Sequence, residues 1–329
     1  AMCEPERCPE EEDAFECRYL SWEELEWEGG ESPRAVLQEA LNGLRSDDWK
    51  QHFTSLQRIQ ALAKFHPSLL ADDIEDIASA VIKQAESLRS GVSRNAILTT
   101  EHLGKGLPAE MAKVAVTLVP PLAQKSVSNK RFLADGAKDA LSALTTEEAA
   151  GESVVMALGS VASDALDRKD SGVATQAAHF LEKALTSVRY SASDVTVRAI
   201  LPTAARLLDA SRPAAKQTAQ RIVSGLYDAS KAGALGGLLE SVTDGRLKRN
   251  LQTCIDAIAK KKRDDGKAGG STQGRGGIRE FIRAQQKAKT VSDPAVIVVA
   301  GKDRAQNGMA AQSTDVSGNP SGNPSPRCD

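Results

Sequence analysis

The sequence predicts an all-α protein, a HEAT- or armadillo-like α-solenoid of six helical pairs with disordered termini. Hydrophobic residues make up 41% of the chain and aromatic residues only 4%, so the apolar side chains are mostly Ala, Leu, Val and Ile. This composition suits closely packed helices better than aromatic-rich strands. A helical pattern that recurs at intervals of about 40 residues makes the solenoid the favoured arrangement of those helices.

The repeat emerges when the second helix of each pair is aligned on one late apolar residue. The aligned residues are Leu62, Leu103, Leu141, Leu185, Leu226 and Ile258. Seven positions earlier lie Ser55, Ala96, Ala134, Ala178, Ala219 and Leu251, and five of these six are small. Seven residues span two helical turns, so both positions share one face, and the small residue lets a neighbouring helix approach closely.

The pairs follow one another along the chain. Apolar periodicity predicts first helices at 33–44, 73–88, 109–124, 147–166, 194–210 and 231–242. It predicts second helices at 47–63, 91–107, 128–144, 171–185, 212–226 and 244–258. Good N-cap residues precede several of them, such as Ser46 and Asp47 or Ser193 and Asp194. The solenoid is therefore expected over 33–260.

Both ends of the chain differ from this middle zone. Residues 1–32 carry 12 acidic and 2 basic side chains, which predicts an acidic disordered leader. Residues 261–329 are rich in Gly, Ser, Asn, Pro and Lys and are expected to form a low-complexity, mostly disordered tail. Within the tail, apolar residues at helical spacing are compatible with a short basic helix at 278–289.

Several classes of function are disfavoured by the sequence. The 5 cysteines include no CxxC pair, and the 4 histidines are far apart, so no metal site or disulfide framework is expected. No phosphate-binding loop or hydrolase motif occurs, and no enzyme or cofactor is expected. No apolar run approaches the roughly 20 residues of a membrane span, and no signal segment opens the sequence. A reducing cytoplasm is the simplest location.

Basic residues recur at the turns inside the pairs. In a stack of helical pairs these turns share one edge, whereas the turns between pairs lie along the opposite edge. Every intra-pair turn carries a cation near its second helix: Lys50, Arg89, Arg94, Lys130, Arg131, Arg168, Lys169, Arg212, Lys216, Arg246, Lys248 and Arg249. Charges favour loops in any protein. The recurrence of positive charge on the same edge of six repeats is not explained by that preference alone. It indicates a basic ridge that binds an acidic partner.

Two kinds of acidic partner could bind such a ridge: nucleic acid and an acidic protein surface. Nucleic acid is disfavoured because residues 33–260 hold only 28 basic against 25 acidic side chains and few aromatics for base stacking. An acidic protein surface fits better, because it requires discrete cationic contacts and an exposed apolar anchor. Trp49 is the candidate anchor. Its helical phase with Phe53 and Leu56 is typical of a core residue, but its place in the first turn of a helix lets it overhang the edge.

These turns resemble those of a known family. The range 33–260 resembles a TOG domain, a paddle of six HEAT-like repeats that binds tubulin heterodimers along its intra-repeat turns. "SDDWK", "GVSRNA" and "SNKRF" resemble its first three tubulin-contacting turns, and "DRKDSG" and "ASRPAAK" fall at the fourth and fifth. "DDWKQHFTSLQRIQALAKFHP" and "LRSGVSRNA" are most similar to the CLASP and crescerin branches.

The resemblance implies a non-catalytic domain that binds tubulin and regulates microtubule dynamics in the cytoplasm and cytoskeleton, and in the cilium or axoneme if it is of the crescerin type. The implied tubulin-binding residues are Trp49, Lys50, Arg89, Ser93, Arg94, Asn129, Lys130, Arg131, Arg168, Lys169, Arg212 and Lys216. The alternative is a generic HEAT-repeat scaffold that grips a peptide or helix of another protein on its concave face.

Overall fold

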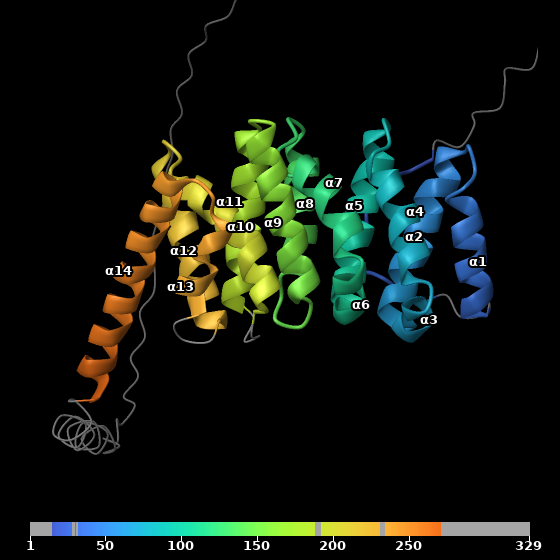
Figure 1. Ribbon diagram of the computed structural model, residues 1–329. Coiled ribbons are helices and arrows are strands. Elements are labelled where there is room, and N and C mark those ends of the chain that lie inside the picture. The colour runs from blue at the N-terminus through green and yellow to red at the C-terminus, as the bar shows by residue number, and fades with distance from the viewer. Residues whose placement is uncertain (1–14, 28–29, 31, 188–191, 231–233, 271–329) are drawn as a thin grey trace, which may run out of the picture. The chain divides into compact units, whose positions relative to one another are not determined.

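The computed structural model describes residues 15–27, 30, 32–187, 192–230 and 234–270 (Figure 1). In these ranges all regular structure is helical, as predicted. The helices are α1 (Pro33–Gly43), α2 (Trp49–Phe65), α3 (Pro67–Ala71), α4 (Ile74–Ala85), α5 (Ser90–Gly106), α6 (Pro108–Lys113), α7 (Ala115–Lys125), α8 (Arg131–Leu144), α9 (Glu152–Asp167), α10 (Ser171–Ser187), α11 (Asp194–Leu208), α12 (Pro213–Ala229), α13 (Ala234–Leu238), η1 (Leu239–Ser241) and α14 (Gly245–Gly270).

The helices form two layers within one compact unit. The first helices α4, α7, α9 and α11 pack on one another in succession. In the second layer α5 packs on α2 and α8, and α10 packs on α12. In the first five pairs the first helix also packs against its own second helix, as in α1 with α2 and α9 with α10. This is the solenoid of helical pairs that the repeat predicted.

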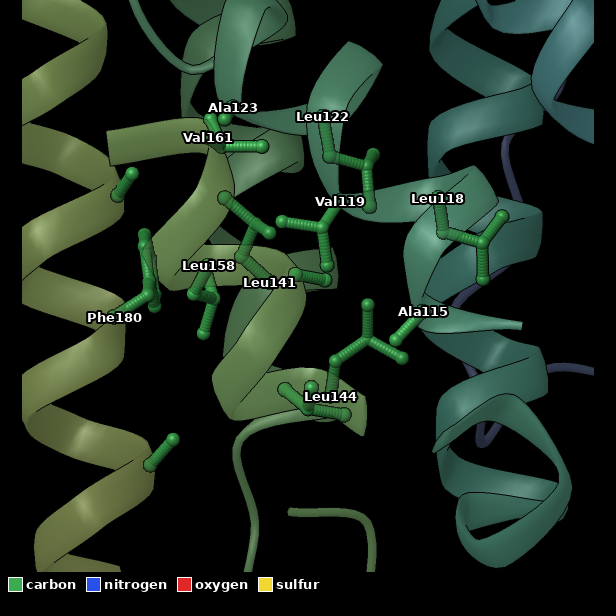
Figure 2. Close-up of a cluster of buried hydrophobic side chains, with 14 of the residues drawn as sticks. Ala115, Leu118, Val119, Leu122, Ala123, Leu141, Leu144, Leu158, Val161 and Phe180 are labelled. Carbon is green, nitrogen blue, oxygen red and sulfur yellow. The ribbon is translucent and has the colours of Figure 1, made fainter. Parts of the chain in front are cut away.

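One hydrophobic core runs through the stack from Val36 to Ile255. Figure 2 shows its centre, where side chains of α7, α8, α9 and α10 interdigitate, among them Leu118, Leu141, Leu158 and Phe180. The aligned anchors from Leu62 to Leu226 are buried, and so are the small residues two turns before them. At Ser55 the fit is so close that a Cβ atom on Gly43 of α1 would clash with the Ser55 hydroxyl. The expected close approach of helices is therefore present at this pair.

The helix boundaries differ from the prediction in two places. Short helices α3 and α6 precede the first helices of the second and third pairs, each starting at a proline whose missing N–H costs nothing at a helix start. The first helix of the sixth pair is only the short α13 followed by the 3₁₀ turn η1. Its sequence, with two adjacent glycines, is a poor helix former.

The ends of the domain also differ from the prediction. Residues 15–27, expected in a disordered leader, lie against α2 and α5, and Leu25 is only 2% exposed. The acidic composition obscured the aromatic and apolar side chains of this segment, whose burial offsets the cost of ordering it. At the other end α14 continues past residue 260 to Gly270, and the compact unit ends at Lys267. The basic helix expected at 278–289 lies outside the described residues.

Candidate functional site

The intra-pair turns lie along one edge of the stack, the upper edge in Figure 1, whereas α3 and α6 lie at the opposite edge. We call this the turn edge and define it by residues 44–48, 86–89, 126–130, 168–170, 209–212 and 242–244, together with the first turn of the helix that follows each. Because the pairs stack in one direction, the turns present their side chains in a row.

Side-chain hydrogen bonds hold the first turn in place. The Gln84 side-chain amide of α4 donates to the Leu44 carbonyl at 3.0 Å, and the His52 ring donates through Nε2 to the Ser46 carbonyl at 2.6 Å. Asp48 caps α2 by accepting from the Lys50 N–H at 2.9 Å. These bonds satisfy main-chain groups that the turn leaves without helical partners. They fix the start of α2 and therefore the position of Trp49.

Trp49 is half-buried rather than fully enclosed, and it packs against the edge of the core. The Phe15 ring meets it edge to face at a centroid distance of 5.2 Å. The Arg89 guanidinium of the second turn lies 5.1 Å from its ring centroid, a cation–π geometry. Its position in the first helical turn therefore leaves part of the ring at the surface, and the periodicity alone would have placed it in the core.

The second turn carries exposed and buried members of the predicted set. Arg89 and Arg94 are exposed, and Leu88 beside them is 100% exposed. Ser93 is 1% exposed, and its hydroxyl donates to the Ala85 carbonyl at 2.6 Å. The inclusion of Ser93 among the contact residues is therefore wrong. Ser93 lies on the inward face of α5, where its hydroxyl donates to a main-chain carbonyl at the end of α4 and cannot reach a partner.

The third turn places Asn129, Lys130 and Arg131 at the surface. Arg131 forms an exposed ion pair with Asp135 at 3.3 Å, one helical turn later. Phe132, which follows, is 42% exposed and lies 5.9 Å from the Arg94 guanidinium. This contact brings the second and third turns into one continuous surface.

The fourth and fifth turns extend the row with Arg168, Lys169, Arg212 and Lys216, all exposed. Lys169 has a φ of 59°, a left-handed conformation in which glycine is usual at a helix end. The Asp170 N–H bonds back to the Ala165 carbonyl at 2.8 Å, and the Asp170 carboxylate accepts from the Val173 N–H. Asp170 therefore closes the turn and caps α10.

The sixth turn differs electrostatically from the others. Arg246 pairs with Asp209 at 2.6 Å, and Lys248 pairs with Glu240 at 2.7 Å. Of the predicted site cations in the first five turns, only Arg131 makes an ion pair among the residues that the structure describes. The predicted site cations of the first five turns are therefore less neutralised by ion pairs than the cations of the sixth turn.

Sequence reasoning missed four apolar or aromatic side chains at this edge: Phe15, Tyr19, Leu88 and Phe132. Phe15 and Tyr19 lie in a segment whose charge predicted disorder. Leu88 and Phe132 stand directly beside predicted cations, and their position in a turn was the available signal. Within the described ranges, no three His, Cys, Asp or Glu side chains gather closely enough to hold a metal ion. In those same ranges no helix has the length and apolarity to cross a membrane.

The two-layered stack and its turn edge define an α-solenoid protein of the HEAT and armadillo class. No protein-family model matches the chain. Among curated proteins it is 29% identical over 122 residues to the crescerin-like protein che-12 of Caenorhabditis elegans. It is 31% identical over 123 residues to the human TOG array regulator of axonemal microtubules protein 1. These matches cover 36% and 37% of this chain. They cover only 9% and 7% of the relatives' own lengths.

Solved structures with a similar arrangement include a TOG domain of Zyg9 from C. elegans, which matches 73% of this chain and 91% of that one. Its TM-score is 0.48 and the sequences are 13% identical. TOG3 of Drosophila melanogaster Mini spindles matches 67% of this chain and 93% of that one, with a TM-score of 0.43 and 16% identity. Of the two branches that the sequence resembled, CLASP and crescerin, the curated matches confirm the resemblance to crescerin-type proteins over about a third of the chain.

Proposed function

We propose that this chain is a non-catalytic tubulin-binding domain that regulates microtubule dynamics and binds the tubulin heterodimer through its turn edge. The observation that carries the proposal is a half-buried Trp49, followed by the half-buried Lys50, on the same edge as exposed cations in the second to the fifth turns. An apolar anchor surrounded by cations is suited to an acidic protein surface. The human relative is named as a regulator of axonemal microtubules, which supports this class of partner and a cytoskeletal or ciliary location.

The physical roles of the two kinds of side chain differ. Exposed cations attract an acidic partner over about 10 Å at moderate ionic strength and raise the rate of association. Trp49 and the fully exposed Leu88 supply apolar area that is removed from water on binding. The proposed complex should therefore weaken as salt is added, without losing all of its affinity.

The alternative is a scaffold that grips a peptide or helix along the second helices of the pairs. Residues 15–27 already lie along α2 and α5, with Gln57 and Lys64 donating to main-chain carbonyls of the segment. A partner peptide would have to displace this segment or bind from α8 onward. That occupancy favours the turn edge over the helical face as the binding surface.

The test is a set of charge and anchor variants in tubulin co-elution and affinity measurements. Trp49→Glu and Lys130→Glu should each weaken tubulin binding, the first most strongly because it places a charge at the apolar anchor. Arg198→Glu is the matched control, an exposed cation near the start of α11 and therefore towards the opposite edge. Equal losses for Lys130→Glu and Arg198→Glu would show that net charge, and not the turn edge, governs binding.

Thermal unfolding of each variant separates binding from stability. Lys130 is exposed, so its reversal should leave the melting temperature unchanged. Trp49 is half-buried, so Trp49→Glu is interpreted only at temperatures where the variant is folded. Normal tubulin binding by folded Trp49→Glu would rule out its role as the anchor.

A further inference from the structure

Residues 15–27 follow the direction of α2 from the turn edge towards the opposite edge. Gln57 donates to the Arg18 carbonyl at 2.7 Å. Lys64, which directly precedes the last residue of α2, donates to the Leu25 carbonyl at 2.9 Å. Further along, the Trp27 ring packs on His66 at 4.5 Å. The far part of the segment is thereby fixed on α2, and its early residues arrive at the turn edge.

Phe15 occupies the space beside the first turn. Its ring meets Trp49 at 5.2 Å and Phe53 at 5.6 Å, edge to face in both cases. Phe53 is 1% exposed and lies one helical turn after Trp49, so it forms a fixed base beneath Phe15. Trp49 therefore has Phe15 as one neighbour and the Arg89 guanidinium as another. Both contacts restrict the rotamers that the indole can adopt.

Tyr19 contacts the second turn as Phe15 contacts the first. Its ring packs edge to face on Phe53 at 5.5 Å, and the Arg94 guanidinium lies 4.0 Å from its centroid. The Tyr19 hydroxyl donates to the Gly91 carbonyl at 3.4 Å, at the start of α5. Burial, with a contribution from Cys17, raises the pKa of Tyr19 although Arg94 acts to lower it, so the phenol stays neutral and remains a donor. Arg94 is thus held over an aromatic ring that no helical pair supplies.

We propose that Phe15 and Tyr19 are positioning residues of the tubulin-binding edge, which hold Trp49 and Arg94 in their binding conformations. This inference rests on the proposed function and deepens it, because the edge then depends on a segment outside the six helical pairs. A side chain that is already ordered in the free domain loses less conformational freedom when the partner binds, which preserves affinity. The domain that binds tubulin therefore includes residues 15–27 and does not begin at α1.

The first test compares Phe15→Ala with Trp27→Ala in the full chain. Both variants remove one ring of the same segment, but Trp27 packs on His66 at the opposite end of α2. Phe15→Ala should weaken tubulin binding about three- to tenfold, the range expected for one aromatic pair, whereas Trp27→Ala should change it less than about twofold. Unchanged affinity in Phe15→Ala overturns the proposal. Tighter binding also overturns it, because the segment would then cover the edge.

The second test measures the solvent accessibility of Trp49 directly. The chain has 3 tryptophans, so a Trp22→Phe and Trp27→Phe background leaves Trp49 as the only indole. In this background, Phe15→Ala should increase acrylamide quenching of Trp49 fluorescence, because one neighbour of the ring is removed. Unchanged quenching would contradict the positioning role. This readout needs no tubulin.

Tyr19 offers a graded comparison. Tyr19→Phe keeps the ring beneath Arg94 and loses only the bond to Gly91, so tubulin affinity should stay near that of the unmodified chain. Tyr19→Ala removes the ring and should weaken binding as Phe15→Ala does. Equal affinity for the two Tyr19 variants overturns the role of the ring.

If Trp49→Glu and Lys130→Glu also bind normally, the proposal that the turn edge binds tubulin fails as a whole. If those two lose binding and Phe15→Ala does not, only the positioning role fails.

Discussion

The side-chain amide of Gln84 donates to the main-chain carbonyl of Leu44 at a distance of 3.0 Å. Gln84 belongs to α4 of the second pair, and Leu44 directly follows α1 of the first pair. Both residues are buried. One hydrogen bond therefore ties the turn that carries Trp49 to the pair that carries Arg89, and the relative position of these two side chains depends on it.

Replacing Gln84 by Met should destabilise the domain, because the Leu44 carbonyl would be buried without a partner. We expect the free energy of unfolding to fall by about 1–3 kcal/mol. Urea denaturation followed by circular dichroism measures it. Gln124→Met is the control, since Gln124 lies exposed on α7 and its replacement should be near neutral. A near-neutral Gln84→Met would show that water or another donor satisfies the Leu44 carbonyl.

Ser93→Ala should separate stability from binding. The Ser93 hydroxyl is buried and donates to the Ala85 carbonyl, so its loss should cost about 1 kcal/mol of unfolding free energy. Tubulin affinity of the folded variant should change less than about twofold, because the side chain does not reach the surface. Unfolding and titration experiments on the same preparation measure both quantities. A large loss of affinity with unchanged stability would restore Ser93 to the contact set.

Leu88→Asp should weaken tubulin binding and leave stability nearly unchanged. Leu88 is 100% exposed in the second turn, where its only apolar contact would come from a partner. Val195→Asp is the control, because Val195 is 71% exposed at the start of α11, on the opposite edge. Binding by isothermal titration should fall for Leu88→Asp alone. Equal affinities for the two variants would remove Leu88 from the binding edge.

His102 should make stability depend on pH below neutrality. Burial lowers the pKa of His102 to about 4, as does the Lys105 charge, while the Glu23 charge acts to raise it. Its Nδ1 has no hydrogen-bond partner among the described residues, and its ring packs on Trp22 at a centroid distance of 5.5 Å. The unfolded chain binds a proton near pH 6.5 and the folded chain only near pH 4. Stability is therefore complete above about pH 6.5 and falls as the pH drops towards 4.

Thermal unfolding between about pH 7 and about pH 5 measures this effect, since carboxylates lose little charge in that window. We expect a loss of about 2 kcal/mol at pH 5 from His102 alone. His102→Leu cannot bind the proton and should show a flatter profile. The same slope in both proteins would assign the pH dependence to other groups.

The fold could be predicted because its signal is local and repeated. Leu62 and Ser55 share one helix face for reasons of helical geometry alone, and the same pair of positions recurs in the later repeats. The sixth pair was less predictable, because the glycines at 236 and 237 leave only short helices where apolar periodicity suggested a full one. Local propensity and periodicity disagreed there, and propensity prevailed.

The site could be predicted only in outline. Exposed cations such as Lys130 and Arg168 were placed correctly at the surface because charges avoid the core. Ser93 was misplaced, since a small polar side chain fits either a surface or a buried hydrogen bond. Phe15 was not considered, because its neighbours are acidic and net charge averages over a segment, whereas packing depends on individual side chains.

The sequence by itself determined the first five helical pairs, the edge on which their turns lie and the sign of the charge there. Periodicity and charge are properties of neighbouring positions along the chain, so they need no knowledge of distant contacts. Only the tertiary structure decided that Trp49 contacts both Phe15 and Arg89 and that Arg94 lies over Tyr19. These residues are 34 to 75 positions apart. The contacts of Phe15 and Tyr19 arise when residues 15–27 bury their rings on α2 and α5, which the pattern of a single sequence does not specify.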